Sequence, residues 1–209
     1  MVESQVRPSD VTDRRVLRAM AQVPRERFVT SGLRSIAYSD GPVKVSDQPV
    51  RYLLAPRTLG KLVQLLEIGD RDVVLVLGCS TGYSTAIIAR VAQSVVAVEE
   101  EAALADKAQT LLADLGINNT AVVAGSLTSG KASEGPFDAI FINGSVEEVP
   151  AAILDQLKDG GRLVTVEPHD GVGRAVQWRR SGKTYGRRVA FDAAAPRLSE
   201  FDKKREFVF

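Results

Sequence analysis

The spacing of apolar residues along the chain changes near residue 70. Before that point, helical spacing is shown by one run of apolar residues: Val16, Leu17, Met20 and Val23. Ser9 or Thr12 can cap this helix, and Pro24 ends it. Turn-forming residues are frequent from 30 to 56, which predicts an irregular lead-in. A short amphipathic helix is expected over residues 58–66.

Short apolar runs then alternate with segments of helical spacing. Strands are expected at residues 73–77, 94–98, 121–124, 139–142 and 162–166, and helices at 80–91, 102–115 and 149–157, the last ended by Asp159-Gly160-Gly161. The tail predicts strands around 175–179 and 207–209, with 187–191 a further candidate. This alternation predicts an α/β fold with a mostly parallel sheet and helices on both faces.

The composition is that of an ordinary globular protein. The chain has 209 residues, 44% of them hydrophobic and 25% charged, which suits one domain over residues 1–209. Within it we expect an N-terminal cap region at 1–66 and a core at 67–209. The net charge of +1 gives no electrostatic reason to expect nucleic acid or a membrane as a partner.

The single cysteine and the polar N-terminus bear on location. Cys79 has no partner for an intrachain disulfide, which favours a reducing compartment. No apolar run approaches the ~18 residues of a membrane span, and the first twenty residues lack a signal-peptide core. We therefore expect a cytoplasmic protein, and we expect no metal site.

The stretch from Gly78 to Gly82 reads Gly-Cys-Ser-Thr-Gly and fits two kinds of site. One is the nucleophile elbow of serine hydrolases, with Ser80 attacking. His169 is the only histidine, and Asp138 or Asp155 could precede it in a triad, but no oxyanion segment of the HGGG type is present. The hydrolase is therefore a distant alternative.

The other kind of site is a nucleotide-binding turn between a strand and a helix. The turn follows the first long buried strand, and the helix after it offers free backbone N–H groups to a ligand. Glu99 ends the next strand about twenty residues on, where an acid accepts hydrogen bonds from a ribose diol. The alternative for Glu99 is a solvated carboxylate at the start of a helix.

Several motifs together resemble the protein-L-isoaspartate O-methyltransferases, enzymes that use S-adenosylmethionine to methylate isoaspartyl residues of damaged proteins. The most specific part is N-terminal, at residues 13–17, 23–29 and 37–42. The cofactor loop of the family resembles residues 78–83, and Glu99 followed by Leu104 resembles its ribose-acid segment. Later motifs resemble residues 136–140 and 149–161.

The resemblance implies a Rossmann-like methyltransferase domain, with N-terminal helices over the cleft and an antiparallel strand near the end of the sheet. It implies S-adenosylmethionine as cofactor, isoaspartyl proteins or peptides as substrate, and a role in protein repair. The cofactor-binding residues it implies are Gly78, Cys79, Ser80, Gly82, Tyr83, Glu99, Ser126 and Asn143. The substrate region it implies contains Tyr52, Leu54 and Pro56. No catalytic residue is implied, because the acceptor carboxylate is already ionised.

The chain also departs from the family pattern. Val76 stands where members usually carry an acid, Ser80 where they carry a glycine, and Ser126 where they carry an aspartate. Residues 51–56 align with a segment that is typically Gln-Thr-Ile-Ser-Gln-Pro, and Tyr52 and Leu54 replace its hydroxyl residues. These departures predict weak cofactor binding and low or absent methylation. The alternative is a family member that has lost catalysis and acts as a binding or interaction protein.

Overall fold

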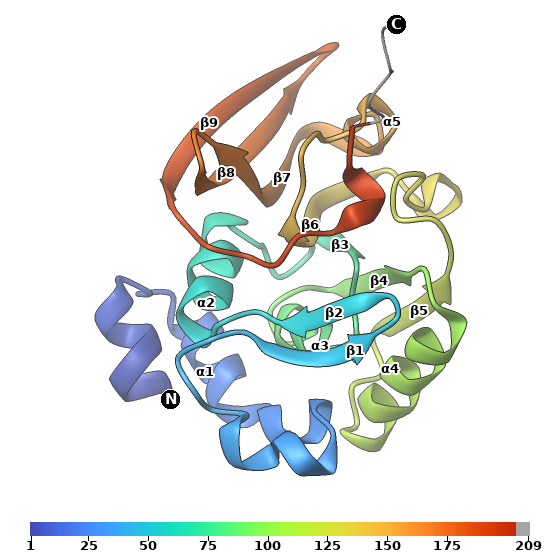
Figure 1. Ribbon diagram of the computed structural model, residues 1–209. Helices are drawn as coiled ribbons and strands as arrows, with labels where there is room; N and C mark the ends of the chain where they lie inside the picture. Colours follow the sequence, from blue (N-terminus) through green and yellow to red (C-terminus); the bar gives the residue numbers. More distant parts are fainter. Residues whose placement is uncertain (204–209) are drawn as a thin grey trace, which may run out of the picture.

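A seven-stranded sheet runs through the structure, a computed structural model in which residues 1–203 are described (Figure 1). Its strands lie in the order β5-β4-β3-β6-β7-β8-β9. Their bounds are β3 Val73–Leu77, β4 Ser94–Glu99, β5 Thr120–Ala124, β6 Phe137–Ser145, β7 Leu157–His169, β8 Val172–Ser181 and β9 Thr184–Asp192. A separate antiparallel hairpin is formed by β1 Val43–Asp47 and β2 Val50–Leu53.

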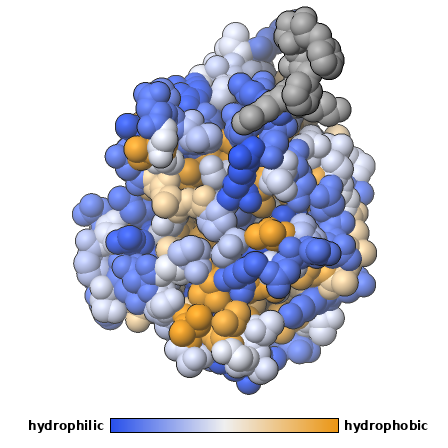
Figure 2. Space-filling model, in the orientation of Figure 1, coloured by the Kyte–Doolittle hydropathy of each residue, from blue (hydrophilic) through white to orange (hydrophobic). Residues whose placement is uncertain are grey.

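The helices are α1 Arg14–Gln22, α2 Pro56–Leu65, α3 Tyr83–Ala89, α4 Ala102–Asp114 and α5 Ala151–Leu154. Short π or 3-10 turns lie at Val2–Val6, Arg7–Ser9, Arg25–Phe28, Ser31–Ile36, Ala132–Glu134 and Ser199–Phe201. No helix within residues 1–203 is both long and apolar enough to cross a membrane. On the face that Figure 2 shows, hydrophilic residues predominate and hydrophobic residues form patches among them.

The direction of the strands changes across the sheet. The five strands from β5 to β7 are parallel, whereas β8 and β9 are each antiparallel to the strand before them. The parallel sheet and the antiparallel end agree with the expected fold. From β3 the chain crosses to β4 on one side, while β6 pairs with β3 on the other. This switch point places a crevice at the carboxyl ends of β3 and β6, the usual place for a ligand in such sheets.

Two apolar layers explain why β3 is apolar throughout. Because side chains alternate along a strand, Val74 and Val76 join the layer under α1 to α4. Leu75 and Leu77 join the opposite layer, which α5 and the C-terminal residues Leu198 and Phe201 cover. A strand buried on both faces has no polar side to present.

Three local expectations for the N-terminal part are corrected. The side chain of Asp13, not Ser9 or Thr12, caps α1 by accepting a hydrogen bond from Arg15 N at 2.8 Å. The lead-in contains the β1–β2 hairpin, which its many turn formers obscured. The helix α2 begins at Pro56, because a proline suits the first turn, where the missing N–H has no helical partner.

The second half also differs in detail. The expected helix at 149–157 is only α5, and β7 begins at Leu157 and runs through Asp159-Gly160-Gly161. The candidate strand at 187–191 is confirmed as part of β9, while the strand expected at 207–209 lies outside the described residues. His169, the histidine of the alternative triad, is the last residue of β7.

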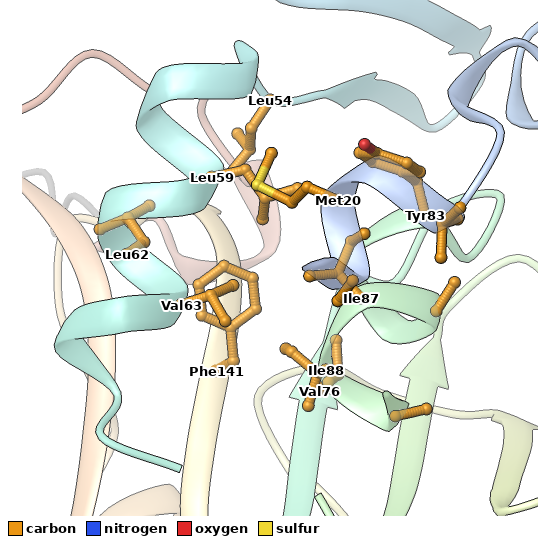
Figure 3. Close-up of a cluster of buried hydrophobic side chains, with 14 of the residues drawn as sticks. Met20, Leu54, Leu59, Leu62, Val63, Val76, Tyr83, Ile87, Ile88 and Phe141 are labelled. Carbon is orange, nitrogen blue, oxygen red and sulfur yellow. The ribbon is translucent and has the colours of Figure 1, made fainter. Parts of the chain in front are cut away.

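Truncation of Phe141 should measure how far stability depends on the layer beneath α2 and α3. Phe141 is fully buried in β6, among side chains that include Val63, Val76 and Ile88 (Figure 3). Phe141→Ala should lower the free energy of unfolding by about 3–5 kcal/mol in urea denaturation. Val189→Ala, at a 43% exposed position of β9, should change it by less than about 0.5 kcal/mol. A loss below about 1 kcal/mol for Phe141→Ala would contradict this packing.

Candidate functional site

The turn between β3 and α3 bends sharply at alternate residues. Gly78, Ser80 and Gly82 have φ values of 72°, 55° and 96°, in the left-handed region that glycine tolerates best. A Cβ atom on Gly82 would lie 3.2 Å from Ala108 Cβ, and one on Gly78 would lie 3.2 Å from Leu198 Cδ1. The two glycines are therefore required by both conformation and space.

Ser80 occupies a glycine position in conformation as well as in sequence. Its side chain is fully buried, and its hydroxyl has no hydrogen-bond partner among residues 1–203. A non-glycine residue at positive φ is strained, and an unsatisfied buried hydroxyl adds to that cost. The turn therefore carries backbone strain at Ser80.

The residues of the alternative hydrolase triad are not assembled with Ser80. The His169 side chain is 61% exposed and lies 3.4 Å from Asp170. Asp138 accepts hydrogen bonds from Val73 N and Lys158, and Asp155 accepts one from Tyr185. No triad hydrogen bond joins these residues to Ser80, so the elbow reading receives no support.

Glu99 is fully buried at the end of β4, so the solvated alternative for it is wrong. Its carboxylate accepts four hydrogen bonds. The backbone N–H of Ser80 donates to Oε2 at 2.8 Å, and that of Glu100 donates to Oε1 at 2.9 Å. Arg51 supplies the other two, because its Nε donates to Oε1 at 3.0 Å and to Oε2 at 3.2 Å. Its Nη2 lies 2.8 Å from Oε1 and completes the ion pair.

Arg51 is the residue of the site that the sequence analysis missed. It lies on β2, and its side chain is only 2% exposed. Its Nη2 also contacts Glu200 Oε1 at 2.6 Å, from the 3-10 turn near the C-terminus. The available signal was the replacement of a neutral family residue by an arginine at the start of the expected substrate segment.

A third carboxylate lies beside this ion pair. Burial and the neighbouring Glu200 carboxylate raise the pKa of Glu100. The guanidinium of Arg51 is therefore surrounded by acidic groups that favour its charged form.

The C-terminal stretch after β9 runs past the carboxyl end of β6, where Ser145 and Arg197 form an isolated bridge (Figure 1). Ser145 N donates to Pro196 O at 2.8 Å, and Leu198 N donates to Ser145 O at 2.9 Å. These bonds hold the 3%-exposed Leu198 side chain against Gly78 and against Gly144, where an added Cβ would lie 2.7 Å from Leu198 Cγ.

Four other predicted cofactor residues have different surroundings. Asn143 donates from Nδ2 to Gly78 O at 2.9 Å and so joins β6 to the turn. Ser126 is exposed just beyond β5, with its hydroxyl 3.0 Å from that of Thr128. Cys79 and Tyr83 are buried in the apolar layer. Burial raises the pKa of both, that of Tyr83 to about 12.

Tyr83 is held by the N-terminal signature. Its ring lies edge-on to Phe28, with centroids 5.4 Å apart, and the fully buried Arg25 lies 4.8 Å from its centroid. Thr81 Oγ1 donates to Phe28 O at 2.7 Å. Arg25 also donates to Leu54 O at 2.8 Å. The N-terminal residues therefore fix both the glycine turn and the substrate segment.

The expected substrate residues point in different directions. Leu54 is buried beside Leu59 and Met20 (Figure 3), and Pro56 opens α2. Tyr52 lines a cavity of about 870 Å³ between the hairpin, α2 and residues 191–197. Arg51 and Tyr52 are neighbours on a strand, so their side chains leave it on opposite faces.

Replacement of Ser80 by glycine should stabilise the protein. Ser80→Gly removes the strained φ and the unsatisfied hydroxyl, against an entropic loss for glycine, for a net gain of roughly 1 kcal/mol. Urea denaturation measures this gain. Ser84→Ala is the matched control, since it removes another buried hydroxyl without a partner but leaves a helical backbone. A Ser80→Gly protein less stable than the parent would show that no strain is stored at this turn.

Comparison with known proteins supplies the family. The sequence profile of the protein-L-isoaspartate(D-aspartate) O-methyltransferases (PCMT) matches residues 1–189. The protein-L-isoaspartate O-methyltransferase of Syntrophus aciditrophicus is 37% identical over 164 residues, which cover 78% of this chain and 74% of that protein.

Solved structures agree on the fold. A protein-L-isoaspartate O-methyltransferase superposes with a TM-score of 0.82 at 24% identity, over 92% of this chain and 63% of that one. A Plasmodium falciparum beta-aspartate methyltransferase (PCMT), solved in complex with S-adenosyl-L-homocysteine, superposes with a TM-score of 0.76 at 20% identity. The superposition covers 93% of this chain and 94% of that one. The chain belongs to the protein-L-isoaspartate(D-aspartate) O-methyltransferase family.

Proposed function

We propose that this protein transfers a methyl group from S-adenosylmethionine to the carboxyl group of isoaspartyl residues in proteins. The observation that carries the proposal is the junction of the glycine turn with Glu99. Ser80 N donates to the Glu99 carboxylate at 2.8 Å, so the turn after β3 and the acid after β4 form one site at the carboxyl ends of the strands.

The residues of this site fit the cofactor only in part. The left-handed turn at Gly78 and Gly82 fits the close approach of a ligand to the backbone. Glu99 does not fit a ribose diol as it is held here, because a carboxylate accepts about four hydrogen bonds and protein donors already supply them. Val76, in the apolar layer, offers no charge to an amino group.

The reaction requires little from individual side chains. S-adenosylmethionine supplies the methyl group, and an isoaspartyl carboxylate is already ionised near neutral pH. Neither a general base nor a covalent nucleophile on the protein is needed. The protein's contribution is to position the acceptor, which makes orientation the main source of rate enhancement.

The cavity beside Tyr52 is the place we propose for the substrate. Its volume of about 870 Å³ lies within the range of ligand pockets. Arg57, Lys61 and Arg197 line it and would attract a carboxylate, although Asp40 and Asp192 lie there too. The cavity reaches Pro196, two residues before Leu198 in the crevice, so it adjoins the proposed cofactor site.

We also propose that the chain works as one domain in the cytoplasm. Residues from both sides of position 66, such as Leu17, Leu59 and Val76, share one apolar layer. The only cysteine, Cys79, is a buried free thiol, as suits a reducing compartment.

Radiolabelled methyl transfer tests the proposed activity directly. The protein should methylate a peptide with an isoaspartyl residue and leave the same peptide with an aspartyl residue unlabelled. The label should reside in a base-labile ester. Absence of label at saturating S-adenosylmethionine, with another family enzyme active on the same peptide, would overturn the proposal and favour a binding protein without catalysis.

Ser126→Asp should improve the use of the cofactor. Ser126 follows β5, where Gly125 N bonds to Glu99 O at 2.9 Å, so an aspartate there would add a charged acceptor beside the site. A charged hydrogen bond contributes roughly 1.5–3 kcal/mol, so KM for S-adenosylmethionine should fall about tenfold or more. Ser129→Asp, also exposed, adds the same charge three residues further on and should leave KM unchanged. Equal effects in both variants would assign any gain to net charge alone.

A further inference from the structure

We propose that Arg51 is a latch on the nucleoside site, so that a ribose reaches Glu99 only after the arginine side chain has left it. The identity of the nucleoside rests on the proposed function. The latch itself rests on the contacts of three side chains: Arg51, Glu99 and Glu200.

The first step is the hydrogen-bonding capacity of Glu99. Its two oxygens accept from Ser80 N, from Glu100 N and, twice, from Nε of Arg51. The backbone donors belong to the turn and to β4, and cannot leave without unfolding them. Arg51 is the only one of these donors on a side chain, so it is the one that a ribose could replace.

The second step is the position of Arg51 outside the sheet. It lies on a two-stranded hairpin, and β1 and β2 pair only with each other within residues 1–203. The flanking Val50 is 47% exposed, and Tyr52 lines the open cavity. The end of the hairpin that carries Val50 and Arg51 can therefore move without breaking hydrogen bonds of the main sheet, while Val43 and Leu53 at its base stay in the apolar layer.

The third step is the ion pair between the guanidinium of Arg51 and Glu200. Glu200 contacts the same Nη2 that contacts Glu99, and it follows Leu198, which lies against Gly78 and Gly144. One ion-pair network therefore holds the hairpin, the turn and the C-terminal segment together over the crevice. Because the network is buried, solvent screens it little. A ligand that needs the open state binds with an apparent affinity reduced in proportion to the fraction of molecules that are open.

Arg51→Gln is the variant that tests the latch, since glutamine is also the residue that the family resemblance places there. Adenosine and 2′,3′-dideoxyadenosine are the probes, titrated by calorimetry without any methyl acceptor. The parent protein should bind both weakly and alike. Arg51→Gln should bind adenosine about ten- to a hundredfold more tightly than the parent does, and should prefer it to the dideoxy compound.

Three further proteins make the result specific. Arg179→Gln removes a charge from an exposed ion pair with Glu67 and should behave as the parent. Glu99→Gln combined with Arg51→Gln should lose the preference for the ribose hydroxyls. Arg51→Lys keeps the charge without the bidentate fork and should give an intermediate affinity, which serves as the test if Arg51→Gln does not fold.

Unchanged adenosine affinity in Arg51→Gln, or in Arg51→Lys if only that variant folds, would overturn the latch. Ribose discrimination by the parent protein as strong as that of Arg51→Gln would overturn it as well, because Glu99 would then be accessible without release of Arg51. Neither result bears on methyl transfer, which the isoaspartyl peptide assay measures separately. Failure of that assay with a working latch would leave a nucleoside-binding protein without catalysis.

Discussion

The carboxylate of Glu99 is the point on which the arrangement of the site depends. Buried without solvent, it must be matched by donors, and it obtains them from the glycine turn, from its own strand end and from the hairpin. The glycine turn, the end of β4 and the hairpin, which are far apart in sequence, therefore all contact the carboxylate of Glu99. The pairing is obligatory in this state, because removing one partner of a buried ion pair leaves an uncompensated charge.

Arg51 shows how a single residue can alter a site whose backbone is intact. The glycine turn, the strand ends and the switch point have the geometry of a nucleotide-binding sheet. Binding of a nucleoside nevertheless depends on whether Glu99 can exchange Arg51 for the hydroxyl groups of the ribose. A buried arginine that satisfies Glu99 from within makes the closed state more stable, and every ligand must overcome that difference.

Much of the sheet could be predicted from the sequence, because the parallel strands contain short, mainly apolar runs between turn signals. The hairpin was not predicted, although Val43 and Val45 alternate with polar residues, because its two strands are short and are surrounded by turn formers such as Asp47 and Pro49. Gly160 and Gly161 were interpreted as the end of a helix, but they lie within the strand β7. In the site, the position of Glu99 followed from the strand end. Its pairing with Arg51 depends on tertiary contact across 48 residues, which no local pattern contains.

The departures from the family pattern act in one electrostatic direction. Val76 and Ser126 each stand where the family has an acid, and Arg51 stands where it has a neutral residue. Each change makes the surroundings of the crevice more positive by one charge. S-adenosylmethionine carries a positive sulfonium and a positive amino group, so each change weakens its attraction. Val76 and Arg51 are buried, and their effects should persist at high salt, whereas that of the exposed Ser126 should fade with screening. The salt dependence of cofactor affinity therefore separates the contribution of the surface position from those of the two buried ones.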